Sequence, residues 1–250
     1  MTLRRLFGMT AGCNVPGYPG YLVGAPLPDD VQILQGAPPA NTPPVVIEKP
    51  PGTVRAYSGG GCQVGQVVLE DASGQSFAAL VEQQVLRPLK MEHSAFWQPP
   101  AASEIAEIAA GHFQNGQEII GAWNVYPEYA AAGLWSTPAD LAQLVVAMAK
   151  AANGDATTPF AARGLDQLLT NVDGLGYGLG VALAGSGRDR IAMKRGNNAG
   201  FRGGLVACPF TGQGAVVMTN GNNGEIIVDN VLDALARHYH WPARAPWPES

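Results

Sequence analysis

Large apolar residues alternate with small ones in the last third of the chain. Across residues 177–183 a tyrosine, two leucines and a valine are separated by Gly or Ala, a period of two that is typical of a strand. Further strand-like runs cover residues 191–194, 201–207 and 215–219, with Gly and Asn between them as in hairpins. This pattern predicts an antiparallel sheet. The side that carries Gly178 and Gly180 is nearly bare, so we expect another segment to pack closely on it.

Helical spacing precedes and follows this region. Apolar residues recur every three or four positions across 77–85, until Pro88 ends the run. Thr137 can cap a helix whose first position is Pro138 and whose buried face includes Leu141 and Met148. The last helix places apolar side chains between residues 228 and 239 on one side, which suits it to cover a sheet.

These elements predict an α+β fold in a single domain over residues 1–250. Residues 1–160 are expected to be mostly helix and loop, and residues 161–250 to form the antiparallel sheet and the terminal helix. Ten of the 20 prolines fall between Pro16 and Pro51, which predicts a loop there with one helical turn near residues 31–34. No internal repeat is visible.

Composition and charge limit the classes of molecule that this protein can be expected to bind. Charged residues make up 14% of the chain, the net charge is -5, and no Lys/Arg cluster offers a surface to nucleic acid. No apolar run approaches the ~20 residues of a transmembrane helix, and the apolar stretch 6–9 is too short for a signal peptide. The three cysteines and four histidines lack ligand spacing, so we expect no metal and no cofactor.

Two segments carry candidate chemistry. Tyr57 is followed by Ser58 and three glycines, which puts a phenol where a loop meets a helix and small neighbours let a substrate approach. Lys194 lies at a strand end before Gly196, where an ammonium and backbone N–H groups can face an anionic centre. Each segment also has a structural interpretation: Tyr57 can cover an apolar surface, and Lys194 can belong to a basic hairpin.

Aromatic residues gather between two helical segments, at Trp123, Tyr126, Tyr129 and Trp135. They can wall an apolar substrate cleft or pack in the core, and the sequence leaves both interpretations open. We interpret Ser136 as part of a helix start rather than as a nucleophile.

Taken together and in order, these segments resemble the serine β-lactamase and penicillin-binding-protein superfamily, especially its class C-like esterase branch. Residues 2–12 resemble the helix and Thr-Ala-Gly turn of this superfamily, and residues 51–61 resemble its tyrosine box. Residues 85–94 resemble its Pro-Leu-Gly-Met stretch, with Lys90 in place of Gly. Residues 133–142 match a further signature, and residues 194–196 resemble its Lys-Thr-Gly box. The resemblance spans nearly the whole chain.

The resemblance implies acyl transfer through a serine ester, with a small-molecule acyl substrate such as a β-lactam, a D-alanyl peptide or an ester. It implies that Tyr57 assists proton transfer, that Lys194 binds a substrate carboxylate, and that the N–H of Asn197 is an oxyanion donor. The other substrate-binding candidates that we assign on this basis are Ser58, Gly196, Asn198 and Trp135. Members of the family are often periplasmic or secreted, but no signal peptide marks this chain and its compartment stays open.

The sequence departs from the family in its nucleophile. No Ser-x-x-Lys occurs in the 250 residues, Gly59 stands where many relatives have Asn, and Met9 replaces a common His. We therefore expect a serine hydrolase whose nucleophile segment is missing from this chain. The alternative is a non-catalytic β-lactamase-like remnant or ligand-binding protein. By the same resemblance, upstream strands of the sheet are missing, so an exposed sheet edge predicts self-association.

Overall fold

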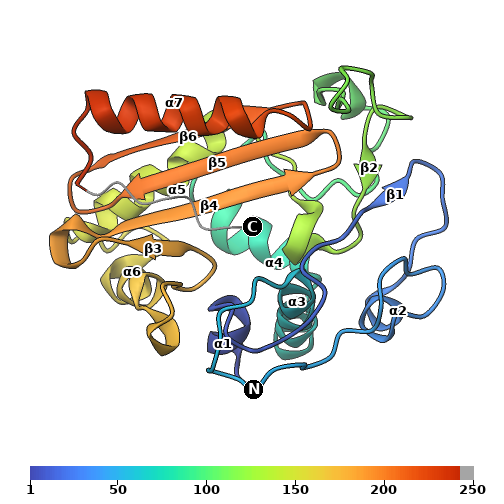
Figure 1. Ribbon diagram of the computed structural model, residues 1–250, viewed down its shortest axis with the longest axis horizontal. Coiled ribbons are helices and arrows are strands. Elements are labelled where there is room, and N and C mark those ends of the chain that lie inside the picture. The colour runs from blue at the N-terminus through green and yellow to red at the C-terminus, as the bar shows by residue number, and fades with distance from the viewer. Residues whose placement is uncertain (243–250) are drawn as a thin grey trace.

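A four-stranded antiparallel sheet organises the structure, a computed structural model that describes residues 1–242 (Figure 1). Its strands are adjacent in chain order: β3 (Ala182–Ala184), β4 (Ile191–Asn198), β5 (Phe201–Cys208) and β6 (Gln213–Thr219). The strand runs expected at 191–194, 201–207 and 215–219 are confirmed, and each is somewhat longer than the sequence indicated. The α+β fold is confirmed as well.

Helices cover both faces of this sheet. On one face, α7 (Glu225–His238) buries Val228 and Leu232 against β4 and β5. On the other face lie α5 (Pro138–Ala152) and α6 (Ala161–Leu169), where Val145 and Leu165 pack against the same strands. The terminal helix therefore covers the sheet as its apolar spacing predicted.

The predicted strand over 177–183 is wrong for its first part. Only Ala182–Ala184 form β3, while Gly176 and Gly180 adopt positive φ and turn the chain back on itself. Alternation with glycine has the period of a strand, but it equally allows such turns. The close packing expected on the glycine side is confirmed at Gly178, where a Cβ would lie 2.0 Å from the carbonyl oxygen of Leu168, but it is wrong at Gly180, where a Cβ would meet nothing within 4 Å.

The remaining helices precede the sheet in the chain. They are α1 (Leu3–Phe7), α2 (Asp30–Gln35), α3 (Gly59–Ser73) and α4 (Phe77–Val81), which continues as a π-helical turn, η1 (Glu82–Leu86). Strands β1 (Tyr21–Leu22) and β2 (Asn124–Val125) form a separate two-stranded sheet. A second π-helical turn, η3 (Tyr129–Gly133), and short 3-10 turns at Ile105–Glu107, Val172–Gly174 and Gly187–Asp189 complete the order.

Local capping fixes where the two longest helices begin. The hydroxyl of Thr137 accepts a hydrogen bond from the N–H of Asp140 at 3.2 Å, and Pro138 occupies the first turn of α5. The hydroxyl of Ser58 accepts from the N–H of Gly61 at 2.9 Å and starts α3 directly after Tyr57. The described residues contain no helix with the length and apolar character that crossing a bilayer requires.

Candidate active site

Tyr57 and Lys194 meet although they are 137 residues apart in the sequence. The Lys194 Nζ donates a hydrogen bond to the Tyr57 phenol oxygen at 2.8 Å and lies 4.5 Å from the centroid of the ring. Tyr57 stands immediately before α3, and Lys194 projects from the middle of β4. The structure thus brings the two strongest candidates from the sequence into one place.

The surroundings of Lys194 determine its charge. Burial on its own would lower the pKa of Lys194, but the neighbouring phenols of Tyr57 and Tyr177 outweigh burial and raise that pKa above its ordinary value. Lys194 is therefore an ammonium at neutral pH. Because it donates to the Tyr57 oxygen, the phenol keeps its own hydrogen for a second partner.

The backbone beside Lys194 is open on one side. Strand β3 pairs only with Ile191–Met193, so among the described residues no strand bonds to that edge of β4 from Lys194 to Asn198. Gly196 and Asn197 are exposed there, and a Cβ at Gly196 would meet nothing within 4 Å. This stretch of edge leaves main-chain N–H groups available beside the ammonium.

Three hydrogen bonds hold the turn between β4 and β5. The Asn198 side chain donates to the Ala132 carbonyl at 2.9 Å, and the N–H of Ala199 donates to the Tyr126 hydroxyl at 2.8 Å. The N–H of Gly200 donates to Asn222 Oδ1 at 2.8 Å. Asn198 is thus half-buried with its amide engaged, and it fixes the end of the open edge to η3. Sequence analysis did not find the parts played by Tyr126 and Asn222, since neither has a local signal.

Ser58 lies beneath the site rather than on its surface. Its side chain is buried, and its hydroxyl donates to the Asn14 carbonyl while it caps α3. The backbone N–H of Ser58 donates to the sulfur of Met9 at 3.4 Å. Met9, which replaces a His common in the family, therefore lies directly beneath the start of α3. The hydroxyl of Ser58 therefore already gives its hydrogen to a backbone carbonyl and accepts the N–H that begins α3.

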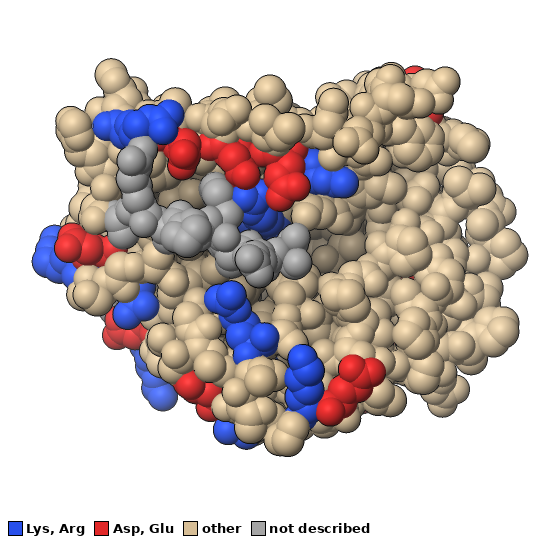
Figure 2. Space-filling view, viewed as in Figure 1, with Lys and Arg blue, Asp and Glu red and all other residues tan. Residues whose placement is uncertain are grey.

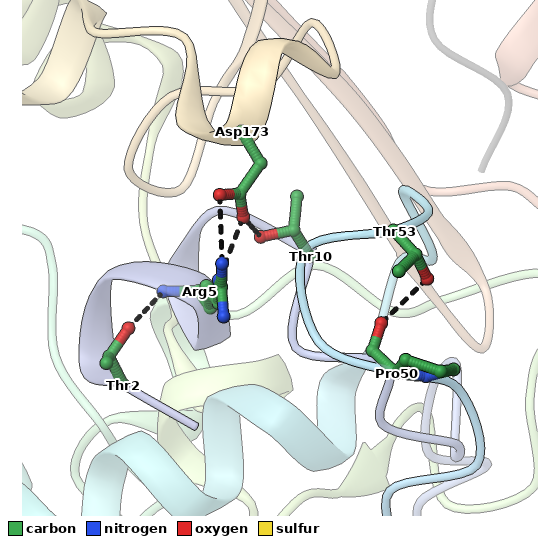
Figure 3. A network of polar contacts seen from close by, with 6 residues as sticks. All are labelled: Thr2, Arg5, Thr10, Pro50, Thr53 and Asp173. Atoms are coloured by element: carbon green, nitrogen blue, oxygen red, sulfur yellow. Dashed lines mark hydrogen bonds and ion pairs between the residues drawn. The ribbon is translucent and has the colours of Figure 1, made fainter.

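The Thr-Ala-Gly turn that carries Met9 is tied to the segment before Tyr57 and to the turn after α6. The N–H of Ala56 donates to the Met9 carbonyl at 2.9 Å. Thr10 Oγ1 donates to Asp173 Oδ2 at 2.7 Å, and Arg5 forms an ion pair with the same carboxylate at 3.1 Å (Figure 3). Arg5 and Thr10 lower the pKa of Asp173 by these hydrogen bonds. The ties fix the loop on which Tyr57 sits.

Trp135 lies in an aromatic row. Its ring meets those of Trp123 and Phe201 edge to face, at centroid distances of 6.1 and 5.7 Å, and its Nε1 donates to the Trp97 carbonyl at 3.0 Å. Trp123 is buried, and Trp135 and Phe201 are half-buried. The row therefore packs as core at one end and reaches the surface beside the β4–β5 turn at the other.

Ser136 belongs to a network that orders the start of α5. Its hydroxyl lies 2.7 Å from that of Ser94, which donates to Asp140 Oδ2 at 2.8 Å. The backbone N–H of His93 donates to the same carboxylate oxygen at 2.8 Å. This arrangement agrees with the interpretation of Ser136 as part of a helix start.

Figure 2 shows the molecular surface hollowed in the middle of the face that contains the end of β4. Lys, Arg, Asp and Glu gather on the left of this view, and the right half is almost free of them. The sequence explains the contrast, because no Lys or Arg occurs between Arg5 and Lys49 or between Lys90 and Lys150. Within residues 1–242, no group of three His, Cys, Asp or Glu is placed to hold a metal ion.

The fold and the site define a protein of the β-lactamase type: a helix-covered antiparallel sheet with a lysine on one strand against a tyrosine at a helix start. The family model described as Beta-lactamase matches residues 1–238. The chain belongs to the Beta-lactamase family, and the resemblance found in its motifs is confirmed.

Solved structures share this fold at low identity. SurE with D-Leu is 22% identical with a TM-score of 0.71, and the match covers 100% of this chain and 57% of SurE. D-amino acid amidase from Ochrobactrum anthropi SV3 complexed with L-phenylalanine is 17% identical with a TM-score of 0.71, over 96% of this chain and 72% of the amidase. Beta-lactamase/D-alanine carboxypeptidase from Yersinia pestis complexed with citrate is 21% identical with a TM-score of 0.66, and the match covers 93% of this chain and 68% of the carboxypeptidase.

The chain thus spans less than two thirds of the SurE chain. No curated protein matches it.

Proposed function

We propose that this chain provides the proton-transfer and substrate-binding part of a serine hydrolase site that works through an acyl-enzyme. The contact between Lys194 Nζ and the Tyr57 oxygen carries the proposal. An ammonium that donates to a phenol oxygen stabilises negative charge on that oxygen, so the phenol can give its proton to a leaving group and take it back from water.

The open edge of β4 supplies the binding groups. The exposed backbone at Gly196 and Asn197 lies beside the Lys194 cation, so a substrate carboxylate and a developing oxyanion can both be met there. The end of the aromatic row at Trp135 and Phe201 offers apolar surface for an acyl group. Asn198 supports this edge through its bond to the Ala132 carbonyl.

The serine nucleophile is the part that these 250 residues do not supply. They contain no Ser-x-x-Lys, and the hydroxyls of Ser58 and Ser136 are engaged in the starts of α3 and α5. We propose that the nucleophile and its activating lysine belong to residues other than these. The same observation favours a second candidate, a non-catalytic relative that binds an acylated ligand at the open edge of β4 beside Lys194.

The substrate proposed is a small acyl compound, a β-lactam, a D-alanyl peptide or an ester. Structures of the same fold carry D-Leu, L-phenylalanine or citrate, each of which bears a carboxylate, and this supports a role for Lys194 in binding such a group. Self-association through the edge of the sheet is also proposed, and β6 is the strand concerned.

Reversible binding by the chain itself tests the proposal. Benzylpenicillin, titrated by calorimetry, should bind without a covalent adduct in the intact mass, and Lys194→Met should weaken binding by about 10-fold or more because a charged hydrogen bond is lost. Lys150→Met, at an exposed position of α5, is the matched control. An adduct on Ser58 or Ser136 would refute the missing nucleophile, and equal binding by both variants would refute the role of Lys194.

The DNA upstream of the Met1 codon separates the two candidates. An in-frame Ser-x-x-Lys there supports the hydrolase, and Tyr57→Phe in that longer protein should lower turnover by roughly 100-fold, the usual scale for a lost acid/base group. A stop codon directly upstream supports the non-catalytic relative.

A further inference from the structure

Tyr177 is a second tyrosine beside Lys194, and it comes from a different part of the fold than Tyr57. Its side chain is 5% exposed. Its backbone pairs antiparallel with Ala182 of β3, and Ala182 pairs in turn with Met193, the residue before Lys194. Paired residues lie opposite each other across a sheet, so Tyr177 is held level with the part of β4 from which Lys194 projects.

The turn that carries Tyr177 is closed by hydrogen bonds on both sides of the residue. The Tyr177 carbonyl accepts from the N–H of Val172 at 2.7 Å. The N–H of Leu183 donates to the carbonyl of Gly176 at 2.9 Å. A backbone fixed in this way, with the ring buried, presents the phenol in one place.

Lys194 lies in a setting made by two phenols and a thiol. Tyr177 and Cys62 are members of one buried core cluster, and Tyr57 packs against the same cluster. Burial raises the pKa of Tyr177, and Lys194 lowers it by its charge and by a hydrogen bond, so the ammonium and the Tyr177 hydroxyl are in contact. Burial raises the pKa of Cys62 as well, against the charge of Lys194. At neutral pH Tyr177 is therefore a phenol and Cys62 a thiol, both uncharged.

One hydrogen bond does not fix a lysine side chain. Its four-carbon chain is flexible, and its ammonium carries three N–H donors that rotate. The bond to the Tyr57 oxygen at 2.8 Å sets one distance, and a second phenol from another element restricts the remaining freedom of Nζ. Two of the three N–H groups are then engaged, which leaves the third for a ligand.

The two phenols are anchored to the same segment. Val172, whose N–H bonds to Tyr177, is followed by Asp173, and Asp173 accepts a hydrogen bond from Thr10 in the Thr-Ala-Gly turn (Figure 3). The same turn is bonded to the residue before Tyr57. The placement of both phenols is thus set by contacts that do not involve the lysine, which is held between two preorganised partners.

We propose that Tyr177 is a positioning residue, which holds the Lys194 ammonium against the Tyr57 oxygen and leaves one N–H of the lysine for a bound carboxylate. The part of this assignment that concerns the carboxylate rests on the function proposed above. Tyr177 is buried, so it acts through Lys194 and does not touch the ligand itself.

NMR of the lysine ammonium groups tests the proposal at neutral pH. The sequence contains four lysines, and the three besides Lys194 are exposed: Lys49, Lys90 and Lys150. Exposed ammonium protons exchange rapidly with water, so in protein with isotope-labelled lysine the slowly exchanging signal should belong to Lys194, and Lys194→Met should remove it. Tyr177→Phe should make this exchange about 10-fold faster, because one hydrogen bond to the ammonium is lost while the ring is kept.

Tyr18→Phe is the matched control. Tyr18 is also a buried tyrosine, but its ring packs in a different core cluster, and its hydroxyl has no hydrogen-bond partner within residues 1–242. This variant should leave the exchange of the Lys194 signal unchanged. Equal acceleration by both variants would overturn the proposal, because the effect would then be a general loosening of the structure, and so would an unchanged rate in Tyr177→Phe.

Nuclear Overhauser contacts in the wild type provide a measurement that needs no variant to fold. The side-chain protons of Lys194 should show contacts to the ring protons of both Tyr57 and Tyr177. A Lys194 signal with contacts to Tyr57 alone would contradict the proposal.

Ligand binding separates this proposal from the function on which it rests. Tyr177→Phe should bind benzylpenicillin about 3-fold more weakly than the wild type, and more tightly than Lys194→Met, because the charge is kept and only its position is lost. Faster exchange combined with wild-type affinity would overturn the positioning role. A wild type that binds no benzylpenicillin would refute the function proposed above, and the exchange rates would still decide whether Tyr177 holds Lys194.

Discussion

Glu128 should make the stability of this protein fall as pH rises. The residue is 0% exposed, and neither carboxyl oxygen has a hydrogen-bond partner among the described residues. Burial raises the pKa of Glu128 to about 7, against the lowering effect of its own backbone N–H and with a smaller contribution from the charge of Asp30. An ionised carboxylate without partners in this position is costly, so the folded state holds its proton where the unfolded state has released it.

The direction and the magnitude of the pH effect on the free energy of unfolding follow from the difference between the pKa of Glu128 in the folded and in the unfolded state. Below the unfolded pKa of about 4.5 both states carry the proton, and Glu128 costs nothing in electrostatic terms. Between about 4.5 and 7 the folded state binds more protons, so the free energy of unfolding decreases with pH, and above about 7 the full cost is present. A difference of about 2.5 pKa units corresponds to about 3 kcal/mol.

Glu128→Gln removes the charge and keeps the shape. Urea unfolding followed by tryptophan fluorescence should show the variant and the wild type within about 1 kcal/mol at pH 5, and the variant more stable by about 2 to 3 kcal/mol at pH 8. Asp30 has a pKa raised to about 6 by burial and by the charge of Glu70, and it titrates in both proteins, so the difference between them reports Glu128 together with its interaction with Asp30. Glu118→Gln, at an exposed site, is the control. A stability difference that does not change with pH would refute the reasoning.

Two further predictions concern the backbone. Gly178→Ala should destabilise the chain by about 2 kcal/mol or more in the same urea assay, because its Cβ would collide with the Leu168 carbonyl. Gly17→Ala, at a glycine that also lacks a positive φ but has open space around it, is the control and should change stability little. If the two alanine variants were equally stable, the collision would not be the cause. Thr137→Ala should cost about 1 kcal/mol through loss of the α5 cap, and Thr137→Ser should restore it. A Ser variant no better than Ala would indicate that the hydroxyl does not cap.

The elements that the sequence predicted well are those with local signals. Thr137 and Pro138 define the start of α5, and apolar runs bounded by Gly and Asn turns indicate β5 and β6, because these patterns depend on neighbours along the chain. Residues 177–181 were assigned to a strand in error, since glycine alternation does not distinguish a strand from a pair of turns. Strands β1 and β2 are two residues each and carry too little pattern to be predicted.

The features of the candidate site likewise fall into those that the sequence predicted and those that it did not. Tyr57 and Lys194 were found through their motifs and the family resemblance, but their contact depends on the packing of β4 against the start of α3. The hydrogen bond that Tyr126 accepts from Ala199 and the titration of Glu128 were not predicted, because the surroundings that create them come from segments distant in sequence. Periodicity shows which residues are buried in general, and it does not show which polar groups are left without a partner.

The ties that hold Tyr57 in place have a consequence for folding kinetics. The hydrogen bonds from Arg5 to Asp173 and from Lys194 to Tyr57 join residues 168 and 137 positions apart. Closing such long loops costs chain entropy before any contact compensates, and proteins rich in distant contacts fold slowly. The helices α3 and α5 can therefore form early on local signals, while the pairing of tyrosine and lysine is completed only when nearly the whole chain has reached its final arrangement.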